Sequence, residues 1–327
     1  MTVSIVIPVY NVSDYIERCI RSVMAQRYKN IECIIVDDAT PDDSVTKCIE
    51  LIAKYAGPIR FSIIHHKNNR GLSAARNTGT DAATGEYVYY LDSDDVITPD
   101  CLMKLSEVAK VHPDAEMISG NYYIIRNNVK EKIGLREELP AEVQSNEALF
   151  ALFQKDMIPP FSWNKMMKLS FIRTNHLRFK EGIIYEDILW RYHIVKYLNV
   201  AYFVKDVTYW YYKRAGSLST AHNEFTYGFS FSVIYDDIIH NLKHGKEREE
   251  LKHSVEGFCY NYIMYKKAIP TYKSLIKDYK KSALHYGCRI AYLKLCLTFV
   301  LGILPFVGKH TFLSLKGVRQ LAKTRFR

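Results

Sequence analysis

The first ninety residues alternate between short apolar runs and segments in which apolar residues recur every three to four positions. Four runs are rich in valine, isoleucine and tyrosine and stop at polar or turn-forming residues, which is typical of buried strands. They lie at 3–10, 31–38, 59–66 and 87–91. The segments between them predict helices near 13–24, 45–53 and 72–83. We therefore expect an α/β fold with a mostly parallel sheet flanked by helices.

Polar residues follow three of the predicted strands. Tyr10-Asn11 lies at the end of the first run, Asp37-Asp38 ends the second, and Asp92-Ser93-Asp94 directly follows the fourth. In a doubly wound sheet, ligands bind outside the carboxyl ends of the strands. The pattern therefore predicts a ligand site at that edge, although acids in such positions are also common in turns and helix caps.

The rest of the chain is organised differently. Residues from about 105 to 220 are irregular and rich in aromatic side chains, and residues 221–327 read as mostly helical. Composition (48% hydrophobic, 24% charged) is that of a globular protein, and no signal peptide is visible at the N-terminus. The seven cysteines are scattered without a CxxC pair, which favours reduced core residues in a cytosolic protein.

The positive charge is concentrated at the end of the chain. Residues 266–327 contain 14 Lys and Arg against one acid, Asp278, a net +13. Since the whole chain is +10, the first 265 residues carry a net −3. The asymmetry indicates an anionic partner for the tail alone, either a membrane surface or nucleic acid. A basic face that is only solvated is the simpler alternative.

The Asp-x-Asp spacing of residues 92–94 suits a hard divalent cation. Mg²⁺ and Mn²⁺ prefer carboxylate, water and phosphate oxygens, and one or two carboxylates commonly hold such an ion against a substrate's phosphates. Surface loops also produce this spacing, so its position behind a buried strand matters. The chain contains neither G-x-G-x-x-G nor G-x-x-x-x-G-K-[ST], which disfavours dinucleotide-binding and P-loop proteins.

Four segments in order resemble the family 2 glycosyltransferases of the nucleotide-sugar type, which have the GT-A (Rossmann-like) fold. They are "VSIVIPVYN", "IIVDDATPDDS", "NNRGLSAARNTGTDAATGEYVYYLDSDD" and "IIYEDILW". The resemblance covers residues 1–220 and implies a GT-A catalytic domain there. Its nucleotide-binding half would be 1–100 and its acceptor-binding half 101–220, followed by a helical, basic region at 221–327.

The resemblance also implies roles for individual residues. The uracil and ribose would be held by Pro8, Val9 and Tyr10, largely through backbone, and the uracil ring by Asp38. Arg76 would be a basic residue near the nucleotide, Asp92 the ribose-side acid with Ser93 beside it, and Asp94 the ligand of Mn²⁺ or Mg²⁺. Arg76 as a surface helix charge is the structural alternative.

The later segments supply the candidates for catalysis. By resemblance, Asp187 is the expected general base, with Glu186 as its substitute; alternatively the pair are acids at a helix N-terminus. Trp163 would stack on a sugar or lie in the core. Lys213 and Ser217 would contact the diphosphate from a segment that closes over it.

The uncharged segment Leu295–Val307 is flanked by Lys294 and Lys309. Its 13 residues are too few to span a bilayer as a helix, which takes roughly 20. An apolar segment between basic residues suits an interfacial helix on an anionic leaflet. A cap packed on the catalytic domain and a dimer contact are the alternatives.

Together these features predict an inverting, metal-dependent glycosyltransferase. It would transfer a sugar from a UDP-sugar to a hydroxyl of a polysaccharide or lipid-linked oligosaccharide. We expect it in the cytoplasm, peripheral on the inner face of the plasma membrane, without a nucleic-acid partner; its oligomeric state stays open. The alternatives are a non-catalytic protein that binds an anionic membrane or nucleic acid, and a nucleotidyltransferase.

Overall fold

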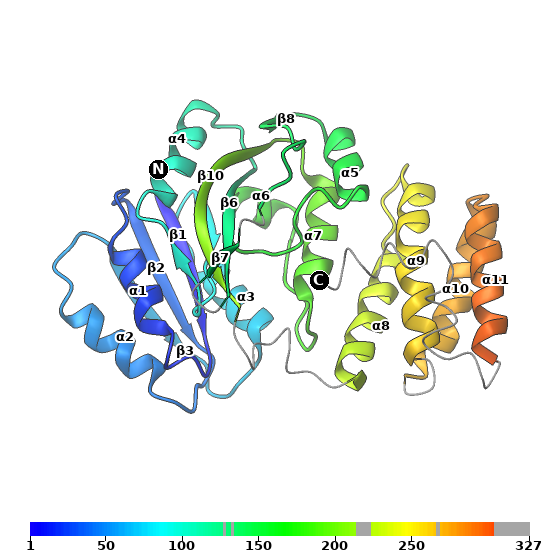
Figure 1. Ribbon diagram of the computed structural model, residues 1–327, viewed down its shortest axis with the longest axis horizontal. Helices are drawn as coiled ribbons and strands as arrows, with labels where there is room; N and C mark the ends of the chain where they lie inside the picture. Colours follow the sequence, from blue (N-terminus) through cyan, green and yellow to red (C-terminus); the bar gives the residue numbers. More distant parts are fainter. Residues whose placement is uncertain (127–128, 132–133, 214–223, 266–268, 304–327) are drawn as a thin grey trace. The chain divides into compact units, whose positions relative to one another are not determined.

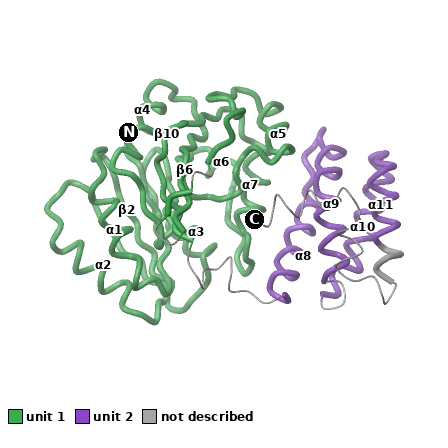
Figure 2. Tube along the Cα trace, in the orientation of Figure 1, with its two compact units in different colours: residues 1–220 green, residues 221–327 purple. Residues whose placement is uncertain are grey.

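The computed structural model describes residues 1–126, 129–131, 134–213, 224–265 and 269–303. The chain forms two compact units, Met1–Thr220 and Ala221–Arg327 (Figure 2). The first is built on a sheet with helices packed against it, and the second is helical. The α/β class with a helical C-terminal region is therefore confirmed, whereas the function of each unit stays a prediction.

One ten-stranded mixed sheet runs through the first unit (Figure 1). Its main path has the order β3-β2-β1-β4-β9-β6-β10-β5, while β7 pairs with β6 and β8 with β10. The strands are β1 Val3–Val9, β2 Ile31–Asp37, β3 Arg60–His65, β4 Tyr87–Tyr90, β5 Val96–Ile97, β6 Met117–Arg126, β7 Val129–Glu131, β8 Glu142–Val143, β9 Lys165–Lys168 and β10 Ala201–Tyr212. The helices are α1 Ile16–Met24, α2 Ser44–Ala53, α3 Leu72–Ala82, α4 Cys101–Val111, α5 Asn146–Gln154, α6 Leu169–Thr174 and α7 Glu186–Tyr197.

The four strands predicted from the first ninety residues pair in parallel. β1 lies between β2 and β4, and β3 pairs with the outer side of β2. The register places Val9 opposite Asp37, and Asp37 opposite His65. The first three strands therefore end level with one another. The residues that follow them lie at one edge of the sheet.

Helices cover both faces of this parallel half. Successive side chains of a strand point to opposite faces, and Ile5 and Ile7 of β1 lie in the same core cluster as Cys19 and Ile20 of α1. Val6 faces the other way, toward α3. A Cβ atom added at Gly79 of α3 would lie 2.3 Å from Val6 Cγ1, so this helix approaches the sheet too closely for any residue but glycine.

The first helix begins three residues later than the sequence predicted. The backbone N–H of Ser13 donates to Asp42 Oδ2 at 2.9 Å, and Lys47 Nζ donates to the Ser13 carbonyl at 3.1 Å. These contacts hold residue 13 in a turn against the start of α2. Regular helix therefore starts only at Ile16.

The second half of the sheet departs from the parallel pattern. Strand β9 pairs antiparallel with β4 on one side and with β6 on the other, and β6 pairs in parallel with β10. Helix α4 packs on β6 and β10, and α5 packs on α7. The mostly parallel sheet that the first ninety residues predicted is thus joined, through one antiparallel strand, to a mixed half.

The second unit is a set of helices: α8 Glu224–His240, α9 Glu247–Tyr265, α10 Thr271–His285 and α11 Arg289–Ile303. Its core is aromatic, with Phe258 of α9 stacked on Tyr279 of α10 at a ring separation of 4.2 Å. Within the described ranges, no helix is long and apolar enough to cross a bilayer. All seven cysteines are free, and all but the half-buried Cys296 are buried.

Candidate active site

The carboxyl ends of β1 and β2 carry two of the predicted site residues, Tyr10 and Asp38. Tyr10 is exposed, whereas Asp38 is buried and its backbone N–H donates to the Val9 carbonyl at 3.0 Å. Each is followed by a non-glycine residue in the left-handed region, Asn11 with φ 52° and Ala39 with φ 55°. Such backbone strain persists where the surroundings fix it, and it clusters at functional sites.

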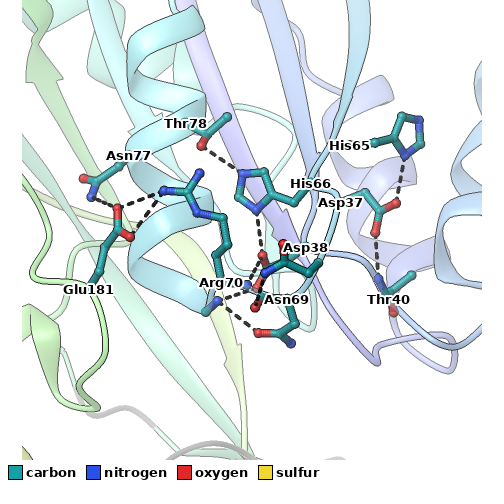
Figure 3. Close-up of polar contacts among 12 residues, drawn as sticks. Asp37, Asp38, Thr40, His65, His66, Asn69, Arg70, Asn77, Thr78 and Glu181 are labelled. Carbon is teal, nitrogen blue, oxygen red and sulfur yellow. Dashed lines mark hydrogen bonds and ion pairs between the residues drawn. The ribbon is translucent and has the colours of Figure 1, made fainter.

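Asp38 is held by three donors from the next strand and loop (Figure 3). Its Oδ1 accepts the backbone N–H of Arg70 at 2.8 Å and lies 2.7 Å from His66 Nδ1, and its Oδ2 accepts the N–H of Gly71 at 2.7 Å. The other ring nitrogen of His66 contacts Thr78 Oγ1 at 2.9 Å. The carboxylate thus fixes the loop that leads into α3, and that loop lies beside the predicted uracil position.

The same loop contacts the segment that precedes α7. Arg70 forms an exposed ion pair with Glu181 at 3.3 Å, and the Asn77 amide lies 3.5 Å from the same carboxylate (Figure 3). Asn77 also donates to the Phe179 carbonyl and accepts the Phe179 backbone N–H, both at 2.9 Å. Hydrogen bonds and an ion pair therefore link residues 66–77 to residues 179–181.

Arg76 lies at the centre of the carboxylates predicted for the donor and for catalysis. Its guanidinium, which is 1% exposed, contacts Asp92 Oδ1 at 2.8 Å, Glu186 Oε1 at 2.6 Å and Asp187 Oδ1 at 3.2 Å. Arg76 is therefore not a surface helix charge. The structure brings Asp92, at the end of β4, together with the Glu186-Asp187 pair at the start of α7.

Helix α7 presents the two acids from its first turn. Tyr185, the residue before it, has a left-handed φ of 60°, a conformation that is rare for a bulky residue. Burial raises the pKa of both Glu186 and Asp187. Neighbouring carboxylates add to the shift, whereas the charge of Arg76 opposes it. A carboxylate whose pKa is raised toward neutrality is suited to accept a proton.

Asp94 and Asp95, which follow β4, have different surroundings. Asp94 is half-buried and Ser93 buried, with Arg18 donating to the Asp94 carbonyl. Asp95 is fully buried; it accepts from Tyr209 Oη and from the Tyr212 backbone N–H, each at 2.7 Å. Asp95 is therefore a buried hydrogen-bond acceptor and is not open to a ligand.

The residues present fit a divalent cation that is shared with a diphosphate. Among the described residues, no three His, Cys, Asp or Glu side chains group closely enough to hold an ion by themselves. Mg²⁺ and Mn²⁺ need only one or two carboxylates when phosphate oxygens supply the remaining ligands. Asp94, half-buried at the ligand edge of the sheet, has the donor chemistry for this arrangement.

The remaining predicted residues lie in varied places. Trp163 is buried in an aromatic stack, 3.6 Å from the Phe161 ring and 4.5 Å from that of Tyr209. Pro8 and Val9 are buried at the end of β1, and Lys213 is exposed directly after β10. Ser217 lies outside the described residues. The ligand contacts assigned to all of these remain predictions.

Sequence reasoning did not identify two residues of this region, His66 and Glu181. His66 ends the third apolar run as Asp38 ends the second, so the strand-end rule that selected the acids would have found it. Glu181 has no such signal, because its partners Arg70 and Asn77 are distant in sequence. Only the fold brings the three together.

Comparison with known proteins connects this site to a family. The sequence model of glycosyl transferase family 2 matches residues 4–174, more than half of the chain. The chain is 27% identical over 230 residues to glycosyltransferase GlyG of Streptococcus pneumoniae serotype 4, covering 66% of this chain and 72% of that protein. It is 29% identical over 228 residues to the cholesterol galactosyltransferase of Borreliella burgdorferi, covering 67% of this chain and 62% of the relative. It therefore spans less than two thirds of the latter protein.

A solved structure shows the fold. The crystal structure of residues 1–349 of TarS from S. aureus, in complex with UDP-GlcNAc, matches 92% of this chain and 90% of that one. The TM-score is 0.67 at 19% sequence identity. The family match ends at residue 174, so Glu186 and Asp187 lie beyond it.

Proposed function

The chain belongs to glycosyl transferase family 2, and on that basis we propose that it is an inverting, metal-dependent enzyme that uses a UDP-sugar. The sugar would be transferred to a hydroxyl of a polysaccharide or of a lipid-linked saccharide. The observation that carries the proposal is the joining of Asp92 to Glu186 and Asp187 through one buried guanidinium. It brings the acid expected beside the donor next to the acids expected to perform catalysis.

The donor would bind at the carboxyl ends of β1, β2 and β4. The exposed ring of Tyr10 offers a flat apolar surface that suits a uracil ring. Asp38, which is buried and accepts the backbone N–H groups of Arg70 and Gly71, would shape the loop beside that ring. Asp92 and Ser93 would face the ribose. The UDP-GlcNAc complex of TarS supports a UDP-sugar as the donor class.

Asp187 would be the general base. Its raised pKa and its place in the first turn of α7 favour removal of the proton from the acceptor hydroxyl as that oxygen attacks C1. Attack from the face opposite the leaving group inverts the anomeric carbon. Glu186, which is more deeply buried beside Arg76, would orient the acceptor or the base.

Asp94 would hold the divalent cation, Mn²⁺ or Mg²⁺. A cation bound there supplies Lewis-acid stabilisation of the departing diphosphate. Lys213 and Ser217, from the segment after β10, are proposed to contact the same diphosphate. Contact of the donor sugar with Trp163 would use the 6% of this residue that the aromatic stack leaves exposed.

We also propose that the second unit binds an anionic membrane surface. Helix α11 presents Ile290, Leu293 and Leu297 to solvent, with exposed fractions of 74%, 66% and 53%. These positions lie on one face of the helix, and the exposed cations Arg289 and Lys294 flank that face. A lipid partner agrees with the relative named for galactosyl transfer to cholesterol.

This surface differs from the one expected from the sequence. Leu295, the first residue of the predicted interfacial segment, is fully buried, and Thr298 is also buried. The stripe formed by Ile290, Leu293 and Leu297 therefore begins before that segment. Residues 304–307 of the predicted segment lie outside the described residues.

The test of the catalytic proposal separates donor binding from chemistry. UDP binding is measured calorimetrically with Mn²⁺ and with Mg²⁺, and transfer or hydrolysis is followed with a panel of UDP-sugars. We expect Asp187→Asn to retain UDP affinity while the turnover rate falls about 10²–10⁴-fold. Full turnover in this variant would remove Asp187 from its role. If the wild-type protein does not bind UDP, the assignment of a UDP-sugar as donor is wrong.

Membership in the family argues against both sequence-based alternatives. A non-catalytic anionic-surface protein would leave the three carboxylates around the buried Arg76 without a role. A nucleotidyltransferase would normally show a glycine-rich, basic loop after β1, where this chain has Tyr10-Asn11-Val12-Ser13.

A further inference from the structure

We propose that Arg76 is a positioning residue, which holds the Glu186-Asp187 pair against the end of β4 and keeps the base ionised, and does not bind the donor. The proposal rests on the function proposed above for Asp187. It concerns a residue for which the sequence implied a different role, near the nucleotide.

The geometry of the guanidinium supports this assignment. Nη1 donates to Glu186 and Asp187, and Nη2 donates to Asp92. Nε is buried without a partner in the described structure, and the guanidinium carbon lies 5.2 Å from the centre of the Phe179 ring. With 1% of its surface exposed, Arg76 has no free face to offer a nucleotide.

Three separate elements meet at this side chain. Arg76 comes from the middle of α3, Asp92 follows β4, and the acid pair opens α7. Phe179, beneath the guanidinium, stacks on Trp190 of α7 at 4.5 Å. Arginine suits this position because its rigid, planar fork can donate to several carboxylates at once, whereas the point charge of lysine cannot do so with the same geometry.

The charges of the cluster define what Arg76 does for the base. Three carboxylates face one guanidinium. Lys165 of β9 also interacts electrostatically with Asp187, and Arg191, one turn further along α7, interacts with Lys165. Without Arg76, Glu186 and Asp187 would adjoin each other and Asp92 without the guanidinium that contacts all three. The pKa of the acid pair would then rise further, and a protonated Asp187 cannot act as a base.

The donor-contact role and the positioning role predict opposite results. Loss of a donor contact weakens UDP binding and raises KM, and the pH dependence of kcat/KM stays where it was. Loss of a positioning cation leaves UDP binding nearly intact and lowers kcat. It also moves the acidic limb of the pH profile upward, because the pKa of the base rises.

The experiment compares Arg76→Met and Arg76→Lys with wild type in the full chain. Arg21→Met serves as the matched control, because Arg21 is an exposed arginine of α1 that forms an ion pair with Glu17 of the same helix. Calorimetry with UDP and Mn²⁺ gives the dissociation constant, and steady-state kinetics between pH 5 and 9 give kcat and kcat/KM. Carboxyl-detected NMR of Glu186 and Asp187 gives their pKa values directly.

We expect UDP affinity within about threefold of wild type and kcat lowered about 100-fold in Arg76→Met. The acidic limb should move up by about 1–3 pH units. Arg76→Lys, which keeps the charge, should show a smaller shift and serves as the readout if Arg76→Met does not fold. A tenfold or greater loss of UDP affinity with an unmoved acidic limb would overturn the proposal. If the wild-type protein transfers no sugar, the proposed function fails. The NMR titrations still test the role of Arg76 in that case. Unchanged pKa values of Glu186 and Asp187 in the variants would refute the proposed role of Arg76.

Discussion

The ammonium group of Lys165 donates a hydrogen bond to the backbone carbonyl of Phe161 and lies 4.4 Å from the centre of the same residue's ring. Both residues belong to the segment that passes beside the start of α7. Burial lowers the pKa of Lys165 to about 7, although the charge of Asp187 acts in the opposite direction. The folded protein therefore keeps a lysine that is only partly charged near neutral pH.

This lysine makes stability depend on pH. Between pH 7 and the ordinary lysine pKa of about 10.4, the unfolded chain binds more protons at this site than the folded chain. The contribution of Lys165 to the free energy of unfolding therefore increases as the pH rises through that window. We expect the difference in unfolding free energy between wild type and Lys165→Met to move in favour of wild type from pH 7 to pH 9.5. Urea denaturation at several pH values measures it.

Tyrosine and cysteine side chains titrate in the same pH range in wild type and in Lys165→Met. Their contributions therefore cancel in the difference between the two unfolding free energies. Parallel curves for wild type and Lys165→Met across this range would show that Lys165 keeps an ordinary pKa.

Asp94 and Asp95 are adjacent, but we expect their replacement to have different effects. Asp95→Ala would leave the buried Tyr209 hydroxyl and the Tyr212 backbone N–H without an acceptor, which should destabilise the fold by about 2–4 kcal/mol. Asp94→Ala should change stability little and abolish the dependence of UDP binding on the divalent cation. Thermal unfolding and calorimetry distinguish the two. A stable Asp95→Ala protein would mean that water replaces the carboxylate.

Gly79→Ala should destabilise the protein, although alanine normally stabilises a helix relative to glycine by about 1 kcal/mol. The new Cβ would lie 2.3 Å from Val6 Cγ1, and overpacking of this kind costs about 1–3 kcal/mol. Adding Val6→Ala makes room for the new methyl group. We expect the double variant to be less destabilised than the sum of the two single variants. Additive effects in denaturant titrations would contradict a direct contact.

The exposed stripe of α11 can be tested with vesicles. Ile290→Ser/Leu293→Ser/Leu297→Ser should reduce cosedimentation with phosphatidylglycerol vesicles at least about tenfold, because partly inserted apolar side chains drive interfacial binding. A matched control is Ile49→Ser/Val111→Ser, which removes two comparably exposed apolar side chains from the first unit. Binding of wild type to phosphatidylcholine vesicles should be weak. Equal binding of the triple variant and wild type would reject this surface.

Local patterns in the sequence were sufficient to predict the parallel half of the sheet. The four apolar runs became β1 to β4, and the strand-end rule placed Tyr10, Asp38 and Asp92 at one edge. These predictions succeed because apolar spacing and turn chemistry are local properties of the chain. Strand β9 could not be predicted in the same way. Its four residues, Lys165–Lys168, include lysines at both ends, and its place between β4 and β6 depends on pairing with distant segments.

The surroundings of the site residues also depend on the fold. The motif around Arg76 indicated a charge near the nucleotide, but which acids it contacts follows from how α3 and α7 pack. Asp95 directly follows Asp94 in the sequence, and only the position of β10 makes it the acceptor for Tyr209. The partners came from segments about 110 residues away.

The antiparallel strand β9 has a consequence for engineering. Because it pairs with β4 on one side and β6 on the other, the residues expected to hold the donor and those expected to hold the acceptor belong to one continuous hydrogen-bonded sheet. A cut near residue 100 would leave the edge of β4 bare and prone to aggregation. Chimeras that join the first half of one relative to the second half of another near residue 100 should therefore fail to fold. To exchange specificity, only the loops beyond the strand ends should be grafted.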